Sequence, residues 1–257
     1  MTNIRAVFLI SAVLLSGFLT DARSEEWTTA KSTHFIVYYK NAPERFISEI
    51  SDKAEEYYDK ITDELGFTRY NFWLWDNRAK IYIHDTQADY QAATGQPRWS
   101  SGCVYIKDKV IHSFPFAKNF YDTVLPHEMG HIIFRELVGF DNPGLPVWLD
   151  EGVASYTQES KYFVAPMVKD AMRNGRLISL KDLSMMNPQE MSDTAQVDLF
   201  YAEAISVVEF LLKRRGQDTF LSFCQALRDK RNFEQALAYA YSYADIDELD
   251  VDWRKNL

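Results

Sequence analysis

The chain has few of the residues that usually build structural metal sites or disulfide frameworks. Its 257 residues include two cysteines, Cys103 and Cys224, and five histidines. A structural zinc ion normally has all four positions filled by protein ligands, usually with cysteines among them. The shortage of cysteine therefore argues against such a site. The two cysteines could pair in an oxidising compartment, but the sequence does not determine whether they meet.

Positive charge is also scarce. The 28 Lys and Arg residues are outnumbered by 37 Asp and Glu, which gives a net charge of −9. This balance disfavours nucleic acids and anionic membrane surfaces as partners. The densest basic run, Lys213-Arg214-Arg215, ends a predicted helix, where cations stabilise the negative end of the helix dipole. We therefore interpret this run as structural.

Only the N-terminus has a long apolar run. Arg5 precedes an apolar segment over residues 6–19, and small residues, Ala22 and Ser24, follow it. This pattern predicts a signal peptide over residues 1–24, cleaved after Ser24, and export to the periplasm or the extracellular space. A retained anchor is the alternative. Beyond this signal we expect no membrane contact, since no later segment approaches eighteen apolar residues without a charge.

The remaining residues, 25–257, are sufficient for one domain. Hydrophobic residues make up 47% of the chain and aromatic residues 15%, which allows a sizeable core. The periodicity predicts an α+β fold, with an α/β lobe over residues 25–140 and a helical lobe over 141–257. Strands are expected at 34–40, 79–84, 103–105 and 110–114, the last two as a hairpin. Helices are expected at 43–65, 89–94, 164–173, 197–214, 218–230, 233–241 and 247–255, besides the two described next.

The most informative pattern is His127-Glu128-Met129-Gly130-His131. Two histidines four residues apart on a helix lie on one face, so both imidazoles can reach one metal ion. Glu128 can lean into the same pocket without being a ligand. We expect this helix to begin at a cap, either Asp122 or Thr123, with Pro126 in its first turn, and to end at Gly139.

A second predicted helix begins near Pro146 and carries Glu151. It would supply a third ligand and leave the fourth position of a zinc ion open for water, which is typical of a catalytic site. Its small residues, Gly152 and Ala154, should let it approach the first helix closely. The loop between the helices, residues 140–146, would mark the boundary between the lobes and a cleft that holds the metal.

These residues resemble the gluzincin metallopeptidases, the thermolysin-like clan in which a glutamate on the following helix completes the His-Glu-x-x-His motif. The run Trp148-Leu-Asp-Glu-Gly-x-Ala154 is similar to the peptidase MA-like families. The resemblance implies a zincin-like fold with the zinc site in the cleft. Weaker similarity extends over most of residues 30–257, at positions 34–39, 99–105, 200–206 and 233–254.

The chemistry also requires a hydrogen-bond donor for the oxyanion of the tetrahedral intermediate. In the clan this donor is commonly a Tyr or His on a helix after the glutamate ligand. No histidine follows His131, and Tyr201 opens a strong predicted helix. We therefore favour Tyr201 as the donor, with Tyr156 and Tyr162 as alternatives.

Four further residues have predicted roles around the metal. Ser155 lies one turn after the glutamate ligand, where it could accept a hydrogen bond from a ligand imidazole. Asp150 is expected only to cap or solvate its helix. Gly102 and Val104 lie in the first strand, Gly102–Tyr105, of the hairpin that precedes the metal helix. We expect one strand of this hairpin to bind extended polypeptide by strand addition, and we favour this first one.

The sequence therefore predicts a zinc metallopeptidase that acts on peptides or proteins. One Zn²⁺ would be held by His127, His131 and Glu151 and would lower the pKa of its water, while Glu128 acts as general base. The alternative is a zinc-binding protein of the same fold with a binding or scaffolding role. The other histidines, His34, His84 and His112, are expected to be structural. The oligomeric state and the cleavage preference do not follow from these patterns.

Overall fold

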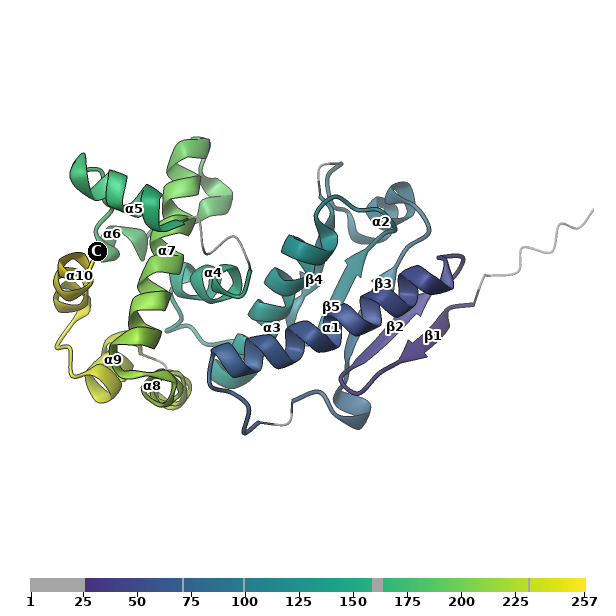
Figure 1. Cartoon of the computed structure of the whole chain (residues 1–257), viewed down its shortest axis with the longest axis horizontal. Coiled ribbons are helices and arrows are strands. Elements are labelled where there is room, and N and C mark those ends of the chain that lie inside the picture. Colours follow the sequence, from purple (N-terminus) through teal and green to yellow (C-terminus); the bar gives the residue numbers. More distant parts are fainter. Residues whose placement is uncertain (1–25, 71, 99, 159–163, 231) are drawn as a thin grey trace, which may run out of the picture.

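The computed structural model describes residues 26–70, 72–98, 100–158, 164–230 and 232–257 (Figure 1). The predicted signal peptide, with its cleavage point after Ser24, lies outside the described residues. Within the described ranges, no helix is both long and apolar enough to cross a membrane.

Five strands form one mixed sheet, in the order β1-β2-β3-β5-β4. The two outer pairs, β1 with β2 and β4 with β5, are antiparallel, and the two inner pairs are parallel. The sequence predicted every strand except β1, whose side chains are mostly exposed and do not alternate between apolar and polar. The strands are β1 (Thr28–Lys31), β2 (Phe35–Tyr39), β3 (Ala79–Ile83), β4 (Gly102–Tyr105) and β5 (Val110–Ser113).

Helix α1 (Glu44–Glu64) runs along the sheet (Figure 1). It buries an apolar stripe of side chains. Ile50, Ala54 and Ile61 are among its fully buried residues, as the periodicity predicts. The chain leaves the helix through Gly66, whose φ of +75° is a conformation that glycine adopts without strain. A shorter helix, α2 (Gln87–Thr94), ends in the same way at Gly95.

All described elements after the sheet are helical, so the predicted α+β class is confirmed. In Figure 1, α3 lies with α1, α2 and the sheet, and α4 to α10 lie together beyond it. Helix α7 is the central element of this second group and packs against α4, α5 and α8. These helices are α3 (Leu125–Val138), α4 (Val147–Tyr156), α5 (Val164–Arg173), α6 (Leu180–Leu183), α7 (Thr194–Arg215), α8 (Gln217–Lys230), α9 (Phe233–Tyr241) and α10 (Ile246–Lys255).

Small residues set the spacing between the helices that carry the site. A Cβ atom on Gly130 of α3 would lie 2.8 Å from the Cα atom of Ala154 in α4. On the other side of α4, a Cβ atom on Gly152 would lie 2.7 Å from the carbonyl oxygen of Ala204 in α7. The prediction that Ala154 faces the metal helix is therefore confirmed, and the same prediction for Gly152 is wrong. Residues two apart on a helix point about 200° apart, so the two cannot share a partner.

Glu203 is a fully buried carboxyl group in the middle of α7. Its Oε1 atom accepts a hydrogen bond from the backbone N–H of Ile178 at 3.0 Å, and its Oε2 atom has no hydrogen-bond partner. Burial raises the pKa of Glu203 from its ordinary value of 4.5 to about 7. The protonated form is therefore the one that the folded protein accommodates best.

This buried group predicts a stability that falls as the pH rises from 4.5 to 7. In that window the unfolded chain has lost the Glu203 proton while the folded protein keeps it, so folding binds a proton and is opposed by rising pH. Glu203→Gln removes the titration and should stabilise the fold at pH 8 by on the order of 3 kcal/mol. Urea unfolding of both proteins at pH 5 and pH 8 measures this difference. The same pH dependence in both proteins would refute the assignment.

Candidate metal centre and active site

The metal helix is entered through a π-helical segment, Phe120–Val124, that runs directly into α3. The predicted cap at Asp122 or Thr123 is wrong, because both residues already have helical backbone and neither caps α3 with its side chain. Pro126 lies in the first turn and Gly139 ends the helix at a φ of +98°, as predicted. Single π-helical turns of this kind are frequent at functional sites.

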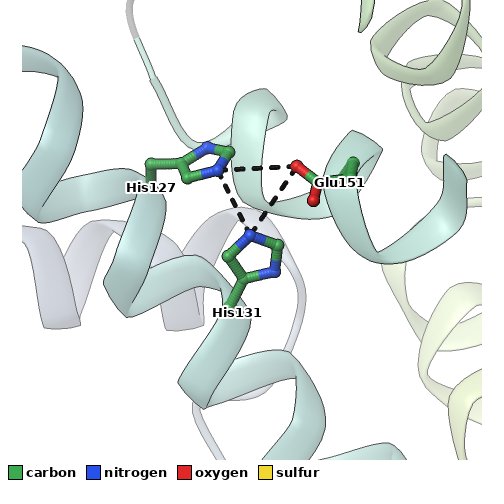
Figure 2. Close-up of side chains that lie close together, drawn as sticks. All are labelled: His127, His131 and Glu151. Atoms are coloured by element: carbon green, nitrogen blue, oxygen red, sulfur yellow. Dashed lines mark hydrogen bonds and ion pairs between the residues drawn. The ribbon is translucent and has the colours of Figure 1, made fainter. Parts of the chain in front are cut away.

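The side chains of His127, His131 and Glu151 converge on one point (Figure 2). We call this position, where the three side chains could hold a metal ion, the metal point. The two histidines project from successive turns of α3, and Glu151 faces them from α4. The Nε2 atoms of the two histidines are 3.2 Å apart. Glu151 Oε2 lies 3.6 Å from His127 Nε2 and 3.8 Å from His131 Nε2. The predicted juxtaposition of the three residues is what the structure shows.

These three atoms, one from each residue, fit a tetrahedral zinc ion. With Zn–N and Zn–O bonds of 2.0–2.1 Å, neighbouring ligands of a tetrahedron are about 3.3 Å apart. The three separations here lie around that value. Glu151 Oε2 is also buried without a hydrogen-bond partner, which is costly for a carboxylate unless a cation neutralises it. Two neutral imidazoles and one carboxylate are the donor set of a catalytic rather than a structural zinc site.

Asp150 positions His131, a role that the sequence analysis missed. Its Oδ2 atom lies 3.2 Å from His131 Nδ1, the ring nitrogen that faces away from the metal point. Arg135 donates two hydrogen bonds to the same oxygen, at 2.7 and 3.0 Å. Asp150 is buried, so the expectation that it solvates its helix is wrong. A second carboxylate beside Glu151, in a helix that is otherwise mostly apolar, was the available signal, since a buried charge requires partners.

The charges of His131, Asp150 and Arg135 stabilise one another. Burial alone would lower the pKa of His131, but Asp150, Glu151 and Glu128 outweigh it and raise that pKa to about 9 in the metal-free protein. A zinc ion would displace this proton, because only the neutral imidazole is a ligand. Burial alone would raise the pKa of Asp150, but His131 and Arg135 lower it to about 2. Asp150 is therefore a permanent carboxylate that holds the His131 ring with Nε2 toward the metal point.

Ser155 has the corresponding position at the other histidine. Its hydroxyl lies 3.5 Å from His127 Nδ1, one helical turn after Glu151. This distance is at the long limit for a hydrogen bond, so the contact is weak.

A cavity of about 440 Å³ opens beside the three candidate ligands. His127, Glu128, Ser155 and Tyr201 all line it. Burial raises the pKa of Glu128, and the nearby histidines only partly oppose this effect. A carboxylate with a raised pKa is suited to take up and release a proton near neutral pH.

Tyr201 is the candidate donor that the structure brings to this cavity. Burial raises its pKa, and so does the adjacent carboxylate of Glu151, so its hydroxyl keeps its proton. Of the two alternatives, Tyr156 packs against the hydrophobic core and is not among the described residues that line the cavity. Tyr162 lies outside the described residues.

Strand β4, predicted to bind substrate through Gly102 and Val104, is the edge strand of the sheet next to α3. Its pairing with β5 leaves the other edge without a strand among the described residues. Burial raises the pKa of Cys103 in this strand, and the negative charge of Glu128 adds to the effect, so the candidate base acts on β4. Gly102 has a packing role, because a Cβ atom there would lie 2.7 Å from Val124. Its lack of a side chain is therefore not by itself a sign of substrate approach.

The remaining histidines and the two cysteines are not among the three candidate metal ligands. His34 pairs with Glu55 at 2.6 Å, and His84 lies 2.9 Å from His112. The two cysteines, one in β4 and one buried in α8, are both free, so the disulfide that the sequence left open does not form.

Comparison with known families agrees with this geometry. The family model of the Peptidase MA superfamily matches residues 75–257, which is more than two thirds of the chain. The matched region contains α3, α4 and α7, the helices that supply the metal point and Tyr201. No curated protein matches the chain significantly.

Proposed function

The chain belongs to the Peptidase MA superfamily, and we propose that it is a zinc-dependent metallopeptidase of the gluzincin type. The observation that carries this proposal is the convergence of two imidazoles and one carboxylate at zinc-ligand spacing beside a cavity that also holds Glu128. A family that consists of metallopeptidases and a donor set that suits catalytic zinc support the same conclusion.

In the proposed mechanism, His127, His131 and Glu151 hold the metal and Glu128 moves the proton. Bound zinc would polarise the substrate carbonyl and make a water molecule acidic enough to act as nucleophile at neutral pH. Glu128 accepts the proton of that water and passes it to the departing amine. Tyr201 would donate a hydrogen bond to the oxyanion, which its position in the cavity wall and its raised pKa support.

We further propose that the substrate backbone lies along the free edge of β4, in a zincin-like cleft between the sheet-containing part and the helical part. The edge position of β4 and its closeness to Glu128 support this placement. The proposed site of action is outside the cytoplasm, in the periplasm or the extracellular space, in line with the expected signal peptide. The scaffolding alternative would need the three ligands but not Glu128.

A digest of a broad peptide library by the metal-stripped protein tests the proposed function. We expect no cleavage without zinc, cleavage after zinc is added, and loss of cleavage when a chelator is returned. Mass spectrometry of the library identifies the cut bonds. Zinc binding without any cleavage, over varied peptides, would overturn the enzymatic function and support the scaffolding role.

A further inference from the structure

The cavity beside the metal point has mostly apolar walls. Apart from the catalytic groups on α3, α4 and α7, its surface comes largely from Val124, from Val164 and Met167 of α5, and from Ala202 and Ile205 of α7. An apolar channel of this kind holds the aliphatic part of a side chain. It does not by itself determine which side chain, because a hydrophobic pocket discriminates weakly between residues of similar size.

One charged residue, Asp198, lies at one end of this cavity. It lies on α7 one turn before Tyr201, and the stripe Asp198, Tyr201, Ala202 and Ile205 has the spacing of a single helix face. With a rise of 1.5 Å per residue, Asp198 lies about 4.5 Å along the helix axis from Tyr201. Asp198 is exposed, so it stands at the outer end of the channel while Tyr201 stands at the metal end.

The charge of the lining is negative. Among the described residues that line the cavity, the carboxylates are Asp198 and Glu128, and there is no Lys or Arg. Bound zinc would offset the charge of Glu128, so the charge that discriminates between substrates is that of Asp198. Asp198 is exposed, so its attraction for a cation has the strength of a surface ion pair. A lysine or arginine side chain satisfies both parts of this surface, because its stem is apolar and its end is cationic.

We propose that this cavity is a specificity pocket for a basic residue next to the cleaved bond, with Asp198 pairing with the cationic end of that residue. The proposal rests on the proposed peptidase function, since it names the substrate class of the same site. The Lys or Arg stem would lie against α5 and the apolar part of the α7 stripe. A glutamate in the same position would place its charge beside Asp198.

Matched peptides that differ only at the residues flanking the cut bond test the proposal. We expect kcat/KM for a lysine peptide to exceed that for its methionine analogue by about three- to tenfold, and the glutamate analogue to be the poorest. Asp198→Asn should bring the lysine and methionine peptides to equal rates, and Asp198→Lys should favour glutamate. Glu209→Gln is the matched control, since it removes one charge from the same helix at a surface pair with Lys213.

The outcomes separate this proposal from the proposed function. Cleavage without a preference for basic residues, or with a preference that Asp198→Asn leaves unchanged, overturns the specificity pocket and leaves the peptidase function intact. If no peptide is cleaved, the proposed function fails, and binding of the lysine and methionine peptides to the zinc-loaded protein decides about the pocket. Equal dissociation constants would refute it, whereas tighter lysine binding that Asp198→Asn abolishes would support it.

Discussion

Glu128→Gln is expected to lower kcat for peptide hydrolysis by on the order of 10²- to 10⁴-fold while zinc remains bound. Glutamine has the size and shape of glutamate, but its amide cannot accept the proton of the attacking water. Glu128 lines the cavity beside the metal point and is not one of the three converging ligands. The substitution therefore removes the base without removing a ligand.

The measurement needs activity, zinc content and stability on the same preparation. Glu209→Gln serves as the control, because it makes the same chemical change at a half-buried surface ion pair on α7. We expect the control to match the wild type in all three readouts. Loss of zinc together with activity in Glu128→Gln would show that Glu128 is a ligand and would contradict its role as the base.

Asp150→Asn is expected to weaken zinc binding by about 10- to 100-fold, the usual effect of losing a carboxylate that orients a ligand histidine. Asp150 is buried between His131 Nδ1 and the guanidinium of Arg135. An asparagine fills the same space but carries no charge to fix the His131 ring and to increase its electron donation to the metal. Arg135 also loses its buried ionic partner.

Competition with a chelator of known affinity measures the zinc dissociation constants. Asp141→Asn is the matched control. Asp141 lies in the loop before α4 and forms an exposed ion pair with Lys107. Circular dichroism of the zinc-free variants shows whether each still folds. A folded Asp150→Asn protein with unchanged zinc affinity would mean that His131 is oriented without Asp150.

The part of the site that the sequence predicted depends on local geometry. His127 and His131 share a face in any α-helix, so their convergence follows from their spacing alone. The position of Glu151 beside the two histidines follows from one more assumption, which is that the loop between α3 and α4 brings the two helices together. Gly130 and Ala154 make that close approach possible.

Three features that the sequence did not predict depend on contacts between distant elements. From the sequence, Asp150 is expected on a helix surface. Its role depends on the packing of α3, which brings His131 and Arg135 against it. Gly152 looks like a partner for the metal helix until α7 is seen to occupy its side of α4. Asp198 gains its place in the cavity only because α5 packs on α7. None of these packings leaves a periodic pattern in the chain.

We propose that one zinc ion, held by His127, His131 and Glu151, makes this protein a peptidase. The most direct test of this proposal is a titration of zinc into the metal-free protein, with bound metal and peptide cleavage measured in the same sample. We expect cleavage to rise in proportion to bound zinc and to reach its maximum at one ion per chain, and His131→Ala to abolish both. Cleavage that persists in the metal-free protein, or one tightly bound zinc per chain without cleavage of any peptide, would contradict the proposal.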